Sequence, residues 1–174
     1  MKKIIYLCLL LFILGGCSSA TLLGAMEEVF DVNIKILYQD DVDEIVLFLT
    51  EDYTGQPMLC LNTFTKEDSS YKYDHGTGGH CQNLDLSNKY EIVNVTSVGN
   101  SSNSAVWGYL HNYPDAETVS YTLEDEKGNI IYSSEIEIAK ENFIFEQLPV
   151  DIFERTHSHH YKVLDKESNT IIER

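Results

Sequence analysis

The second half of the chain repeats one pattern, a short apolar segment followed by a polar turn. The segments recur at intervals of roughly 8–12 residues, and Gly, Asn, Asp and Ser are common in the turns between them. This spacing is typical of antiparallel β-sandwiches, in which each short strand contributes alternate side chains to one core. The pattern predicts strands at 90–98, 105–111, 118–123, 130–138, 143–145, 159–164 and 170–172.

The first half predicts a smaller unit, a brief helix followed by a β-meander. Glu27 and Glu28 lie in the first turn of a predicted helix over residues 25–30, where the helix dipole favours acids. Apolar and polar residues then alternate over 30–38, which is the period of a half-buried strand. Further strands are expected at 44–50, 58–64 and 71–73, before a seam at 85–89.

The fold class that follows is mostly β, with a small α+β N-terminal part. We expect a helix and an antiparallel β-meander over 27–88, then an Ig-like β-sandwich over 89–174. The Cys-Trp-Cys arrangement of antibody domains is absent from the sequence, so the expectation concerns the architecture alone.

The N-terminus combines two basic residues, an apolar run and two small residues that precede a cysteine. Lys2 and Lys3 precede the apolar residues 4–14, and the run ends in Leu14-Gly15-Gly16-Cys17. A run this short is typical of a secretory signal peptide. Its last four residues resemble the lipobox of bacterial lipoproteins. The resemblance implies that residues 1–16 are removed, that Cys17 carries a diacylglycerol, and that 17–26 form a lipidated tether on the extracytoplasmic face of the cell membrane. An uncleaved apolar anchor, the alternative, also places the domain outside the cytoplasm.

The charge balance limits the classes of partner. Without residues 1–16 the chain keeps 10 basic and 28 acidic residues, a net charge of 10 − 28 = −18. Nucleic acid is therefore not an expected partner, because phosphate contacts need a basic face. The acidity is explained either by solubility beside an anionic membrane or by a cationic partner, such as a basic protein or a divalent metal.

Two cysteines remain after the signal peptide and the lipidated residue are set aside. Cys60 and Cys81 form an even pair in an exported domain, which predicts one disulfide. The alternative is two free thiols that form a soft-metal site together with His80.

A cluster of histidines near the C-terminus is the main candidate metal site. His157 and His159 would project to the same face of an extended strand, where two neutral imidazoles can share Zn²⁺ or Cu²⁺. A tetrahedral site needs a further ligand, such as Asp151 or Glu154. The alternative interpretation is a polar turn followed by the exposed face of an edge strand.

Other motifs favour structural roles. Asp40, Asp41, Asp43 and Glu44 could gather around Ca²⁺, but they lack the EF-hand spacing and are typical of a hairpin tip. The Gly-rich residues 75–80 lack the Lys-Ser/Thr ending of a phosphate-binding loop and predict a turn with positive φ. Trp107 is expected in the core. The sequence contains no nucleophile motif, so we expect a protein that is not an enzyme and needs no cofactor.

Several short motifs accompany the lipobox: residues 25–30, 45–48, 76–79, 106–109 and 161–166. In this combination the chain resembles uncharacterised cell-envelope lipoproteins of Gram-positive bacteria, which have a lipobox, a short helix, a meander and an Ig-like sandwich. The resemblance implies no site residues. The expected function is non-enzymatic binding or scaffolding in the envelope, through a protein partner. The alternatives are a metal-binding lipoprotein that uses His157 and His159, and an immunity-type lipoprotein against a basic toxin.

Overall fold

The computed structural model of the protein describes residues 19–76, 78–99 and 103–174. Strands dominate this part of the chain, which confirms the mostly-β prediction. In chain order the elements are α2 (Leu22–Glu27), β1 (Lys35–Asp40), β2 (Ile45–Glu51), β3 (Pro57–Glu67), β4 (Ser70–Tyr73), β5 (His80–Asn83), β6 (Tyr90–Ser97), β7 (Ser104–His111), β8 (Ala116–Glu124), β9 (Ile130–Glu137), β10 (Phe143–Gln147), α3 (Ile152–Arg155), β11 (Ser158–Asp165) and β12 (Thr170–Glu173).

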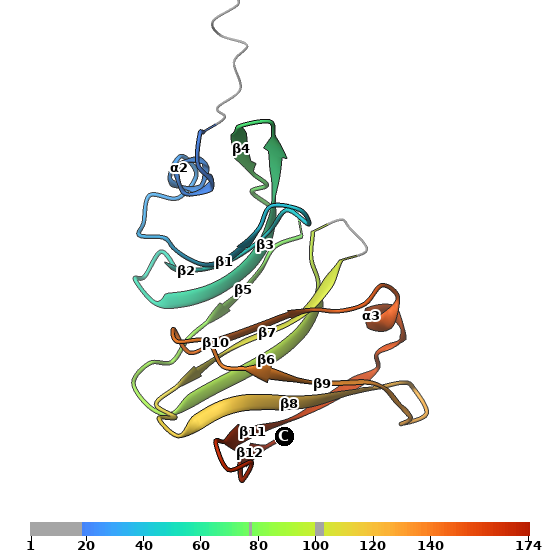
Figure 1. Cartoon of the computed structure of the whole chain (residues 1–174). Helices are drawn as coiled ribbons and strands as arrows, with labels where there is room; N and C mark the ends of the chain where they lie inside the picture. The colour runs from blue at the N-terminus through green and yellow to red at the C-terminus, as the bar shows by residue number, and fades with distance from the viewer. Residues whose placement is uncertain (1–18, 77, 100–102) are drawn as a thin grey trace, which may run out of the picture.

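The strands form three antiparallel sheets that are stacked face to face, with α2 on the outside of the first (Figure 1). The N-terminal sheet has the order β1-β2-β3-β4, and β5 also pairs with β3. The middle sheet has the order β10-β7-β6, and the C-terminal sheet has the order β12-β11-β8-β9. The connections β7–β8, β9–β10 and β10–β11 each cross between the middle and C-terminal sheets. These two sheets therefore form the expected seven-stranded, Ig-like sandwich.

The middle sheet is covered on both faces. Alternate side chains of β7 point to opposite sides, because successive residues of a strand do so. Val106 and Leu110 join the core shared with the C-terminal sheet, whereas Ala105 and Trp107 join the core shared with the N-terminal sheet. Trp107 is 1 % exposed, which confirms its predicted burial. The two halves of the chain thus share a hydrophobic core across the seam.

The helix begins earlier than the sequence pattern predicts, so the prediction of a tether over 17–26 is wrong for residues 22–26. The side chain of Thr21 caps α2 by accepting a hydrogen bond from the Gly24 N–H (3.1 Å). Leu22, Ala25 and Met26 are buried against the N-terminal sheet. Their i, i+3, i+4 spacing and the capping threonine are the signals that the prediction missed.

The first strand begins at Lys35 and not at residue 30. Phe30 and Ile34 still pack against the same core as α2, but they do so from a segment without strand pairing. The alternating pattern therefore overstates the length of the strand, and it also predicts burial for Val32, which is 37 % exposed.

The disulfide between Cys60 and Cys81 is present, which confirms the predicted pairing. It joins β3 to β5, a short strand that the sequence pattern did not predict, at directly opposed positions of the antiparallel pair. Cys60 is buried beneath α2, in the core formed with Phe48 and Phe64. The bond therefore fastens the edge of the N-terminal sheet to its centre.

Candidate functional site

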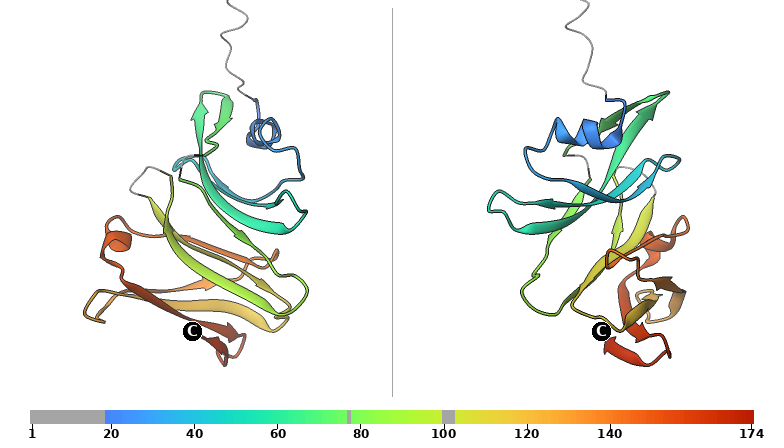
Figure 2. Two further views of the ribbon diagram at one scale, coloured as in Figure 1. Left: turned by 180° about the vertical axis from the view of Figure 1, so that it is seen from behind. Right: turned by 60° about the vertical axis from the view of Figure 1, so that its left-hand side comes forward.

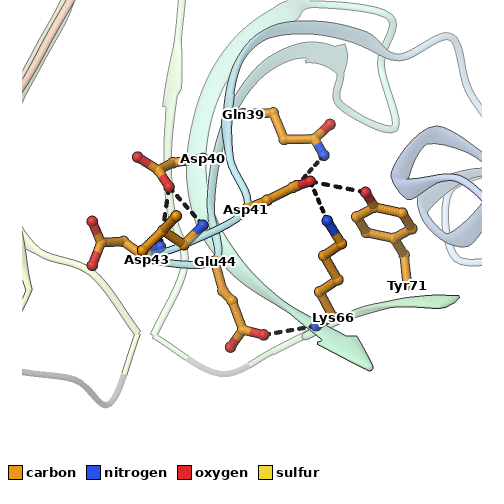
Figure 3. A network of polar contacts seen from close by, with 8 residues as sticks. Gln39, Asp40, Asp41, Asp43, Glu44, Lys66 and Tyr71 are labelled. Carbon is orange, nitrogen blue, oxygen red and sulfur yellow. Dashed lines mark hydrogen bonds and ion pairs between the residues drawn. The ribbon is translucent and has the colours of Figure 1, made fainter. Parts of the chain in front are cut away.

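The acidic turn between β1 and β2 is linked by side-chain contacts to the β3–β4 hairpin (Figure 3). Asp41 accepts hydrogen bonds from Lys66 Nζ (2.6 Å) and the Tyr71 hydroxyl (3.0 Å), and its second oxygen accepts one from Gln39. Lys66 and Tyr71 belong to β3 and β4, so the carboxylate connects the β1–β2 turn to the β3–β4 hairpin. The hydrogen bond from Lys66 is the main cause that lowers the pKa of Asp41.

Two other acids of this turn, Asp40 and Glu44, are directed at backbone groups. Asp40 Oδ1 accepts hydrogen bonds from the N–H groups of Val42 (2.8 Å) and Asp43 (3.1 Å), which lower its pKa. Glu44 Oε1 accepts one from the Lys66 N–H (2.7 Å). These oxygens already have protein donors. The arrangement therefore favours the hairpin-tip interpretation over a Ca²⁺ site.

The histidine pair does not acquire further metal ligands in the described part of the chain. His159 lies on β11 with its ring Nε2 3.2 Å from the carbonyl oxygen of Val93 on β6. His157 precedes the strand, and its N–H donates to the carbonyl of Glu124. Across residues 19–76, 78–99 and 103–174, no group of three or more His, Cys, Asp or Glu side chains is placed to hold a metal ion.

The Gly-rich turn has the predicted backbone conformation. Gly76 and Gly78 have φ of 81° and 67°. Gly78 also packs closely on the backbone of Gly99, whose N–H donates to the Gly78 carbonyl (3.3 Å). A Cβ on Gly78 would lie 2.7 Å from that backbone, so the close approach requires glycine. The contact between Gly78 and Gly99 therefore joins the backbone just before β5 to the backbone just after β6.

The outer face of the C-terminal sheet is not covered by any other described layer. Val119, Tyr121 and Leu123 of β8 point into the sandwich, so the residues between them point outward. Paired positions on β9 and β11 follow from the strand register. We define the outer face by Thr118, Ser120 and Thr122 on β8, Ser133, Glu135 and Glu137 on β9, His160 and Lys162 on β11, and Glu173 on β12.

This outer face is polar and shallow. A row of hydroxyls runs along β8, and its charged neighbours include the Lys162–Glu173 ion pair (Nζ to Oε1, 3.0 Å). A hollow of about 200 Å³ lies beside Ser120, His160 and Arg174. Pockets for small molecules are usually about 300–1,000 Å³. The face therefore suits a macromolecular contact better than a small ligand.

A second polar network, which the sequence did not reveal, connects β6 to the segments that follow β7 and β12. Glu91 on β6 accepts hydrogen bonds from the Tyr113 hydroxyl (2.6 Å) and from Arg174 Nη2 (2.9 Å). Burial, followed by the hydrogen bond to Glu91, raises the pKa of Tyr113 to about 12. These residues lie 22 and 83 positions from Glu91. No local motif could have linked them, because only the fold brings them together.

Comparison with known proteins adds no assignment to this geometry. No protein-family model matches the chain, and no curated protein or solved structure is significantly similar to it.

Proposed function

We propose that the protein is an extracytoplasmic lipoprotein, anchored by a diacylglycerol on Cys17, which binds a partner protein without catalysing a reaction. The observation that carries the proposal is the order of residues 2–17, in which a basic head and an apolar run end in Leu14-Gly15-Gly16-Cys17. These residues lie outside the part that the structure describes. In the described part, no helix has the length and apolar character needed to cross a bilayer.

The disulfide supports the proposed compartment. Bonds of this kind persist in oxidising environments outside the cytoplasm and are rare in reducing ones. Cys60 and Cys81 form the pair within the folded domain, and Cys17 is thereby left available for the lipid.

The outer face of the C-terminal sheet is the proposed binding surface. It presents polar side chains on a rigid frame, and the carboxylates of Glu135 and Glu137 flank its hydroxyl row. With a net charge of −18 for the proposed mature chain (10 − 28), a basic protein is the partner that electrostatics favours. A basic toxin is one partner of this kind. A Zn²⁺ or Cu²⁺ role for His157 and His159 has no comparable support.

Lipidation is tested by exchanging the cysteines of the signal region one at a time. Cys17→Ala should abolish the diacylglycerol mass increment and release the protein from washed membranes. Cys8→Ala changes the same residue type outside the lipobox and should leave both unchanged. An intact Met1 and an unmodified thiol at residue 17 in the native protein would contradict the proposal.

The binding surface is tested by placing a bulky cation in it. A partner captured from envelope extract by the lipid-free protein should be lost with Ser120→Arg. It should be retained with Tyr53→Arg, because Tyr53 is 99 % exposed on the distant β2–β3 turn. Equal capture by both variants would rule out the outer face as the contact.

A further inference from the structure

Ser19, the first residue that the structure describes, already pairs with the N-terminal sheet. The N–H and carbonyl of Ser19 pair with the backbone of Tyr71 on β4, at 3.1 and 2.8 Å. Thr21 caps α2 two residues later, and Leu22 is buried at the start of the helix. No flexible segment separates Ser19 from the packed N-terminal sheet.

This attachment leaves a very short connection to the proposed lipid. Cys17 lies two residues before Ser19, and an extended chain spans at most about 3.6 Å per residue. The Cα atom of Cys17 is therefore within about 7 Å of that of Ser19, whatever the conformation between them. We propose that the end of the molecule formed by α2 and the β3–β4 hairpin is held against the lipid headgroups as a membrane-facing surface. This inference rests on the proposed lipidation of Cys17.

The stacked layers determine which surface of the molecule lies farthest from the bilayer in this orientation. Three layer spacings of about 10 Å separate α2 from the C-terminal sheet, a total of roughly 30 Å. Both views in Figure 2 place α2 and β4 at one end of the molecule and the C-terminal sheet at the other. A molecule held at its α2 end therefore presents the outer face of the C-terminal sheet away from the bilayer.

The membrane-facing surface carries apolar and acidic side chains. Leu23 on α2 and Val29 after it are 38 % and 41 % exposed, and they are available for contact with the interfacial region. Glu27 and Glu28 lie between them and are repelled by anionic headgroups. The connection of about 7 Å is shorter than the physiological screening length of about 8 Å, so salt does not fully screen this repulsion. The charges therefore oppose contact with the membrane, and the short covalent connection is what keeps this end of the molecule at the surface.

The test uses the full-length, lipidated protein in vesicles of phosphatidylcholine and phosphatidylglycerol that contain a nitroxide-headgroup lipid. A fluorescent amino acid replaces either Leu23 or Ser133, an exposed residue of the outer face. We expect several-fold stronger quenching at position 23 than at position 133. Insertion of a Gly/Ser linker of about 12 residues between Ser18 and Ser19 extends the reach by roughly 20 Å and should remove the difference.

The outcomes separate this inference from the function on which it rests. Lipidated protein with equal quenching at the two positions, or with quenching that the linker leaves unchanged, would overturn the orientation and leave the lipoprotein assignment intact. Protein that lacks the lipid mass and does not associate with vesicles would overturn both. Asymmetric quenching that depends on the short connection supports the proposed orientation.

Discussion

The core shared by the N-terminal and middle sheets predicts that the whole described chain unfolds as one unit. Leu61 on β3 is fully buried in this core, and Leu123 on β8 is fully buried in the core between the middle and C-terminal sheets. Leu→Ala at either position removes three buried carbon atoms, worth about 2.4 kcal/mol at about 0.8 kcal/mol each. The cavity left behind raises the expected loss to about 3 kcal/mol.

The assay is urea unfolding of the lipid-free protein, followed by fluorescence and by far-ultraviolet circular dichroism. Trp107 is the single tryptophan and lies in the shared core, so its fluorescence reports on the contact between the halves. We expect Leu61→Ala and Leu123→Ala each to move one common transition, by about 6–12 °C in the corresponding thermal experiment. The exposed control Val42→Ala should change stability by less than about 0.5 kcal/mol.

Separate domains would give a different result. Leu61→Ala would then shift only a fraction of the circular dichroism signal, and Leu123→Ala would shift the remainder. Two resolved transitions, each sensitive to one substitution, would refute the shared-core reasoning.

Two other predictions concern the disulfide and the Glu91 network. Replacing both Cys60 and Cys81 by Ala opens a loop with a sequence separation of 21 and should lower the free energy of unfolding by about 3 kcal/mol. The measurement is a denaturant titration beside the oxidised wild type. A loss below about 1 kcal/mol would count against the loop-closure explanation. The pKa of Tyr113 is raised to about 12, so its neutral form favours the folded state, and that stability is lost as pH rises from 10 to about 12. Glu91→Gln should lower this pKa toward 10, as followed by tyrosinate absorbance, and an unchanged titration would exclude Glu91 as a cause.

Local patterns predicted most of the strands because their causes are local. The alternation in β8 and the apolar run in β2 each depend on which faces of a strand are buried, and neighbouring residues record this directly. The disulfide was predictable for a different reason, because the folded domain has two cysteines and therefore one possible pairing. The strand β5 was missed because four residues after a Gly-rich turn carry too little pattern, and its position depends on Cys60 of a distant strand.

The candidate site was less accessible from sequence than the fold. The hydroxyls of Thr118, Ser120 and Thr122 share one face because side chains alternate along a strand, but the sequence does not reveal that no other described layer covers this face. The hydrogen bonds to Asp41 likewise come from residues 25 and 30 positions away in the sequence. The four acids suggested a cation site because the sequence does not reveal that three of them already have protein donors, namely Lys66 and backbone N–H groups.

The enclosure of β7 also bears on the aggregation risk of this protein. Its apolar, β-prone sequence, with no proline and no ionised side chain from Ser104 to Leu110, is the kind of segment that forms intermolecular β-structure when exposed. In the native stack β6 and β10 pair with both of its edges, and neighbouring sheets cover both of its faces. Another chain can reach β7 only after the stack opens, so the risk of aggregation is limited to polypeptide in which the three sheets are not assembled.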